Sequence, residues 1–130
     1  MNQAWIKPLL LLAAAYDLIL GLAALLAFKP IYQRFAVTLP NHAGYVQWGA
    51  AVVIVFGIGF WLAAMNPARN RDIIVMGVLF KLAFAGTVLG HDFLGSVPTI
   101  WVPFAWADLA FALLFMAMLR SLPRSGSAMA

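Results

Sequence analysis

Four long apolar stretches, separated by short polar segments, dominate the hydrophobic pattern of the chain. A bilayer core about 30 Å thick requires roughly 20 apolar residues of α-helix, and each stretch reaches about that length. The pattern predicts transmembrane helices at about 8–28, 44–65, 72–90 and 100–119. Barrel strands are not favoured, because the stretches are too long for such strands and lack strict alternation. We therefore predict a single all-α membrane domain, 1–130, folded as a four-helix transmembrane bundle.

The segments outside the predicted spans differ in character. Residues 29–43 contain two prolines among aromatic and polar residues, which predicts an interfacial segment along the outer membrane surface. The 66–71 link is short, so the second and third helices are expected to be antiparallel neighbours. Residues 91–99 are typical of a turn-rich loop. The tail, 121–130, is mostly small and polar and is expected to be frayed.

The composition changes the picture by excluding whole classes of protein. Hydrophobic residues make up 65% of the chain and charged residues 9%, against about 45–50% and about 25% in soluble domains. A water-soluble fold and a disordered chain are both excluded. The absence of cysteine removes disulfides, thiolate metal sites and iron–sulfur clusters. No basic stripe supports nucleic-acid binding, so the expected partner is the lipid bilayer, with a homo-oligomer or a larger membrane complex left open.

The distribution of basic residues predicts the orientation. With four spans, both termini and the middle link lie on one side of the membrane. That side carries five basic residues outside the spans, whereas the other side carries Lys29 and Arg34. The five are Lys7, Arg69, Arg71, Arg120 and Arg124. The positive-inside rule then predicts cytoplasmic termini, in a multi-pass protein of the bacterial inner (cytoplasmic) membrane.

The N-terminal segment has a second interpretation. Lys7, followed by the leucine and alanine run at 9–15, is also typical of a signal peptide with a small-residue cleavage site. The apolar run resumes after Asp17 and continues to Phe28, which favours a full membrane span.

Three ionisable residues fall near the middle of three different predicted spans: Asp17, Lys81 and Asp108. A charged residue at a helix centre costs about 2.5–3.5 kcal/mol on insertion scales. The least costly arrangement turns all three inward, so we predict that they meet with Lys81 between the two carboxylates.

Small residues lie one helical turn from each of these three positions, and they support the prediction that the three side chains face the other helices. Residues three or four apart share a helix face, and small side chains let helices approach closely in lipid. The flanking residues are Ala13, Gly21, Gly77, Ala85, Ala105 and Ala112. Glycines also occur in the second span, where they suggest close packing, and Gly86 and Gly90 form a GxxxG pattern that predicts packing within one chain or, alternatively, dimerisation.

The predicted cluster carries a surplus negative charge. Two carboxyls and one ammonium sum to −1 when all are ionised, and a low-dielectric interior disfavours that state. One Asp is therefore expected to hold a proton, which makes the cluster a candidate proton or ligand site. A buried polar clamp that only fixes the helix register is the other interpretation.

Polar residues at the outer ends of the spans form a second candidate group. His42 precedes the second span, His91 and Asp92 follow the third, and Arg34 lies in the first outer segment. Two imidazoles and a carboxylate can ligate a divalent metal or haem, but the spacing does not favour either. Interfacial polar residues, with Asp92 paired to Arg34, are the alternative.

Several segments give the chain a resemblance to known proteins. It has four short spans, with an Asp in the first and in the last. The resemblance also rests on the segments 57–64, 66–71 and 107–111, and on Lys81, ten residues after the end of the second segment. This layout resembles small uncharacterised four-helix membrane proteins of bacteria, loosely DoxX-like in size and hydropathy. That resemblance implies a quinone-linked redox or accessory role. The chain is also similar to small multidrug-resistance transporters, although Asp17 replaces their glutamate and Lys81 is foreign to their pattern.

Three classes of function follow from these observations. The favoured one is a non-catalytic accessory subunit or a quinone- or lipid-binding bundle held by Asp17, Lys81 and Asp108. The alternative is a proton-coupled small-solute transporter or pore that acts as an oligomer. A membrane enzyme using the outer His and Asp residues is third, because no hydrolase, ATPase or dinucleotide motif is present in the sequence.

Overall fold

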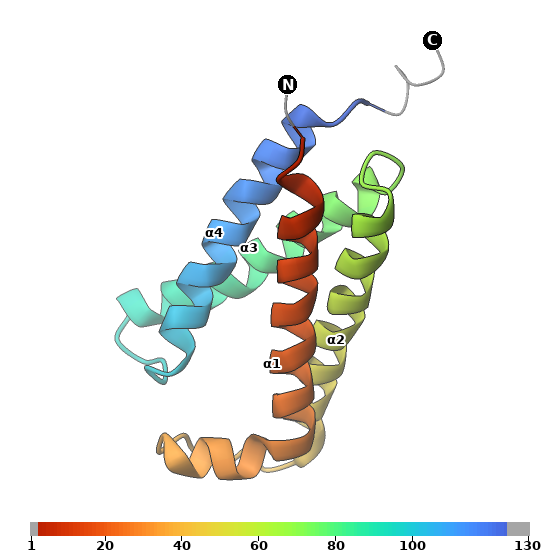
Figure 1. Cartoon of the computed structure of the whole chain (residues 1–130). Coiled ribbons are helices and arrows are strands. Elements are labelled where there is room, and N and C mark those ends of the chain that lie inside the picture. The colour runs from red at the N-terminus through yellow and green to blue at the C-terminus, as the bar shows by residue number, and fades with distance from the viewer. Residues whose placement is uncertain (1–2, 125–130) are drawn as a thin grey trace.

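The structure of the protein is a computed structural model, of which residues 3–124 are described. It contains four helices, α1 (Ile6–Arg34), α2 (Ala43–Met65), α3 (Arg71–Phe93) and α4 (Trp101–Ser121), and no strand among the described residues (Figure 1). Each helix is long and apolar enough to cross a membrane. The predicted all-α four-helix class is confirmed.

Helix α1 extends beyond the predicted end of the first span. It contains a break at Ala27, where φ is −140° and ψ is 26°, and it then continues to Arg34. Pro30 explains the break, because its ring lacks an N–H and clashes with the carbonyl one turn earlier. After the break, the helix turns away from the direction of its first part (Figure 1). Part of the predicted interfacial segment is therefore helical.

Two other boundaries differ from the sequence prediction. Helix α3 ends at Phe93, so His91 and Asp92 lie in its last turn and not in the following loop. Helix α4 includes Ser121, the first residue of the tail predicted to be frayed. Residues 122–124 are not helical, but Leu122 is buried, so the tail is ordered at that residue too. Residues 125–130, the rest of that prediction, lie outside the described part of the chain.

The helices associate as two hairpins. Most contacts between elements are those of α1 with α2 and of α3 with α4, while α2 contacts α3 much less. The close approach in the first hairpin depends on glycine: a Cβ at Gly57 would lie 2.8 Å from Cγ of Leu18. The short link does make α2 and α3 antiparallel, but the main partner of each is the other helix of its own hairpin.

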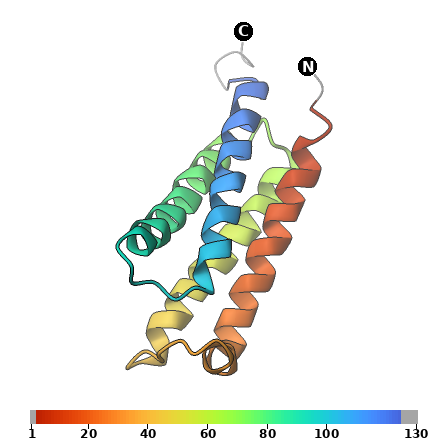
Figure 2. The ribbon, with the colours of Figure 1, turned by 90° about the vertical axis from the view of Figure 1, so that its left-hand side faces the viewer.

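The two hairpins pack together mainly at the end of the molecule that carries both termini. The buried apolar core there includes Leu10, Phe60, Ile74, Phe115 and Met118, which come from all four helices. Arg71 reinforces this end, because its Nη1 donates to the carbonyls of Leu119 (2.7 Å) and Leu122 (3.1 Å). The hairpins separate toward their connecting loops, as Figures 1 and 2 show.

Candidate functional site: a buried charged cluster

The three mid-span ionisable residues meet inside the bundle. Nζ of Lys81 on α3 lies 3.0 Å from Oδ1 of Asp17 on α1 and 2.9 Å from Oδ1 of Asp108 on α4. The exposed fractions are 0%, 2% and 6% for Lys81, Asp17 and Asp108. The ammonium donates a hydrogen bond to each carboxyl. The prediction of a lysine between two aspartates is confirmed.

Small residues flank the three charged side chains, although Gly21 of α1 faces Ala50 and Ile54 of α2 and not α3 or α4. All six predicted flanking residues are buried: Ala13, Gly21, Gly77, Ala85, Ala105 and Ala112. The packing is tightest at Gly77, where a Cβ would collide with the ring of Phe60 and lie 3.1 Å from Cε2 of Phe115. The glycine therefore leaves room for two aromatic rings one turn from Lys81.

Four aromatic rings surround the Lys81 ammonium. Nζ lies 5.0 Å from the ring centroid of Phe111, 5.2 Å from Tyr16, 5.6 Å from Phe60 and 5.9 Å from Phe80. These distances fall within the range of cation–π attraction. The rings supply part of the stabilisation that a buried cation loses on leaving water.

Sequence reasoning missed these four rings, although three of them carried a signal. Tyr16 and Phe80 directly precede Asp17 and Lys81, and Phe111 follows Asp108 by three residues on the same helix face. Phe60 comes from α2, which contributes no charge to the cluster. Nothing local in the sequence marks that ring as a neighbour of Lys81.

The cluster has unused hydrogen-bonding capacity. Oδ2 of Asp17 and the hydroxyl of Tyr16 are buried and have no hydrogen-bond partner among residues 3–124. A buried carboxylate oxygen without a donor is costly, and the cluster has one carboxyl more than it has ammonium groups. A proton or a small polar ligand at this oxygen would remove that cost.

The outer-side candidates are not assembled into a site. His42 caps α2, because its Nδ1 accepts a hydrogen bond from the backbone N–H of Gly44 at 2.9 Å. Within the described range, no group of three or more His, Cys, Asp or Glu residues could hold a metal ion. The structure therefore does not bring His42, His91 and Asp92 together.

The alternative pairing of Asp92 with Arg34 is not found in the described structure. Within residues 3–124 no ion pair joins Arg34 to Asp92, and Arg34 instead places its guanidinium 5.8 Å from the ring centroid of Phe35. Arg34 and Asp92 belong to different hairpins, which separate at this end of the molecule (Figure 1). The separation explains why the two charges do not pair.

The GxxxG pattern in α3 does not pack within the chain. Gly86 and Gly90 are exposed, and a Cβ at either would meet no atom within 4 Å. The prediction of packing inside one chain is wrong, because this face of α3 points away from the other helices. Contact with a second copy stays a prediction.

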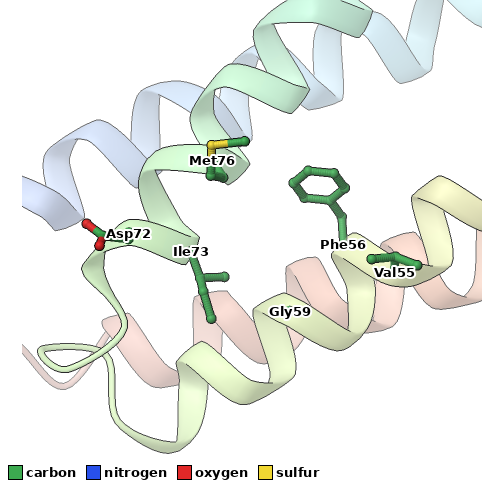
Figure 3. Close-up of a pocket in the computed structure, with 6 residues that line it drawn as sticks. All are labelled: Val55, Phe56, Gly59, Asp72, Ile73 and Met76. Carbon is green, nitrogen blue, oxygen red and sulfur yellow. The ribbon is translucent and has the colours of Figure 1, made fainter.

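An apolar groove of about 310 Å³ lies between α2 and α3. Its lining residues are Val55, Phe56, Gly59, Asp72, Ile73 and Met76. Figure 3 shows Phe56 of α2 and Met76 of α3 facing the same space, while the Asp72 carboxylate points away from it. The Phe56 ring also stacks on Phe80, with centroids 4.1 Å apart and planes 4° from parallel. This stack links the groove wall to the rings around Lys81.

Comparison with known proteins gives no match to a family model, to a curated protein or to a solved structure.

We predict that removing the lysine of the cluster destabilises the protein, whereas neutralising one aspartate does not. Replacing Lys81 by Met leaves two buried carboxyls without their shared donor, and breaking a buried pair in this way costs about 3–5 kcal/mol. Asp17→Asn removes the surplus charge and keeps an oxygen that accepts from Lys81, so it is expected to be tolerated. Membrane insertion and thermal unfolding in detergent are the measurements.

The matched control is the triple variant Lys81→Met, Asp17→Asn, Asp108→Asn, which removes every charge of the cluster and is expected to recover most of the loss. Equal expression and equal unfolding temperatures for Lys81→Met and Asp17→Asn would contradict the assignment.

Proposed function

We propose that this protein is a non-catalytic membrane protein that binds a lipid-soluble molecule, a quinone or a lipid, in the groove between α2 and α3. The buried charged cluster holds the bundle in the shape that leaves this groove open. In this proposal the protein acts as an accessory subunit in a bacterial inner membrane. The excess of basic residues beside the two termini supports a cytoplasmic location for that end.

The groove is the observation that carries the proposal. Five of its lining residues are apolar or glycine, and its volume of about 310 Å³ reaches the lower end of the usual range for ligand pockets. It lies where α2 and α3 make few contacts, so a ligand can enter sideways from the bilayer. A site of this size holds a quinone head group or several carbons of an acyl chain.

The surface that lines the groove is entirely apolar. Asp72 is exposed in the first turn of α3, and its carboxylate points away from the space between Phe56 and Met76 (Figure 3). An apolar wall suits the hydrophobic ring or acyl chain of a lipid-soluble molecule.

Filling the groove tests this proposal. A Cβ at Gly59 would lie 3.4 Å from Cγ2 of Ile73, so Gly59→Leu places a side chain in the space that the ligand would occupy. We expect organic extracts of the gently solubilised wild-type protein to contain a defined quinone or lipid, and those of Gly59→Leu to have lost most of it. Mass spectrometry of the extracts measures both.

The control is Gly49→Leu on the same helix, where a Cβ would meet no atom within 4 Å. It should retain the ligand. Identical, non-stoichiometric lipid mixtures from all three proteins would overturn the groove as a binding site.

The unpartnered oxygen of Asp17 supports a second candidate function, a proton-coupled small-solute carrier or pore. The Asp108 side chain keeps 9% of its surface exposed, whereas the Asp17 side chain keeps 3%. A proton could thus reach the cluster at Asp108 and reside at Asp17. Because four helices enclose little volume, a transport path would require an oligomer.

Liposome measurements distinguish this candidate from the first. A carrier predicts proton flux, read with an entrapped pH dye, when small organic cations or anions are supplied one at a time. Asp17→Asn and Asp108→Asn should abolish the flux, while Asp92→Asn, at the exposed end of α3, should leave it unchanged. Flux equal to that of empty liposomes for every solute would reject the carrier.

A further inference from the structure

A second cavity lies at the end of the molecule that carries both termini. It has a volume of about 240 Å³ and forms where the start of α1, the link between α2 and α3, and the residue after α4 converge. This is the end marked N and C in Figures 1 and 2. Its lining residues are Gln3, Ile6, Lys7, Asn66, Pro67, Ala68 and Leu122.

The cavity has an apolar side and a polar rim. Ile6 and Leu122 are buried, whereas Gln3, Lys7 and Asn66 are exposed. Its position at the ends of the membrane-spanning helices corresponds to the head-group level of a bilayer. A molecule that fits this combination has a polar head and an apolar part directly attached to it.

Existing hydrogen bonds hold two of the rim residues in place. Nε2 of Gln3 donates to the carbonyl of Ser121 at 2.5 Å, and Oδ1 of Asn66 accepts from the backbone N–H of Arg69 at 3.2 Å. Lys7 differs from them, because its ammonium makes no ion pair or hydrogen bond with any residue in 3–124. The rim therefore carries one unpaired positive charge, that of Lys7, beside two side chains held by hydrogen bonds.

The charge around the cavity favours an anion. This end of the four spans carries more basic than acidic residues besides Lys7. The basic ones are Arg69, Arg71, Arg120 and Arg124, and the acidic one is Asp72. Arg71 is already engaged with α4 carbonyls. Lys7, Arg69 and Arg120 attract anionic lipids, at about 1 kcal/mol for each basic residue near the surface.

We propose that this cavity binds the phosphate group of an anionic phospholipid, with Lys7 as the charged contact. The glycerol and the first acyl carbons then lie against Ile6 and Leu122. Free phosphate offers the same charge, but it leaves the apolar side of the cavity empty. The site is separate from the α2–α3 groove and does not depend on the function proposed for that groove.

Competitive lipid binding tests the proposal on the full chain. The protein is reconstituted with phosphatidylglycerol and phosphatidylcholine of identical acyl chains, and the bound lipids are measured by native mass spectrometry. We expect preferential retention of one phosphatidylglycerol. Lys7→Gln should weaken it about fivefold, the factor that corresponds to about 1 kcal/mol.

The matched control is Lys29→Gln, an exposed lysine beside the opposite loop, which should leave the preference unchanged. Equal retention of the two lipids, or equal losses in Lys7→Gln and Lys29→Gln, would overturn the site. A phosphorus NMR titration with inorganic phosphate separates the two sources of the anion. Saturable, Lys7-dependent binding of phosphate alone, as tight as that of the lipid, would overturn the assignment to a phospholipid.

Discussion

One ammonium group shared by two carboxyls constrains the whole structure. Lys81 donates to Asp17 and to Asp108, and these three residues come from α3, α1 and α4. Left unpaired at mid-membrane depth, three such residues would cost on the order of 8–10 kcal/mol. Pairing requires the three helices to pass close to one point, and the buried Gly77 and Ala112 beside the cluster make that approach sterically feasible.

This constraint acts between two units that are already well packed internally. Lys81 and Asp108 belong to the second hairpin and Asp17 to the first, so the Lys81–Asp17 contact joins the two hairpins near mid-span. Toward the termini, apolar packing and the Arg71 hydrogen bonds hold them together; toward the loops they separate. The charged cluster therefore lies between a closed half and a splayed half of the molecule. The groove and the termini-end cavity both lie in the closed half, at the edges of its packed core.

Most of this site could be predicted from the sequence, because an ionisable residue inside the membrane must face the interior of the bundle and pair with another polar group. Length and hydropathy predict the four helices, and the cost of burying charge predicts that Asp17, Lys81 and Asp108 meet. The flanking small residues predict which faces approach. The break at Ala27 was harder to predict, because a proline such as Pro30 is compatible both with the end of a helix and with a kink inside one.

Other features depend on tertiary geometry that no local pattern encodes. Phe60 reaches Lys81 from a helix without charges, and the outward direction of Gly86 and Gly90 follows from how the hairpins pair. For the same reason, charges placed on one side of the membrane, such as Arg34 and Asp92, need not be neighbours. Depth in the bilayer can be predicted from the sequence, whereas lateral position cannot.

The central claim is that the Lys81 ammonium lies between both carboxyls within the membrane. Solid-state NMR on protein in lipid bilayers, with ¹⁵N in lysine and ¹³C in the aspartate carboxyls, measures this directly through dipolar couplings. With Nζ 3.0 Å and 2.9 Å from the two Oδ1 atoms, we predict strong coupling of Lys81 to two carboxyl carbons, one of which is lost in Asp17→Asn and the other in Asp108→Asn. A Lys81 nitrogen coupled to neither carboxyl would contradict the account.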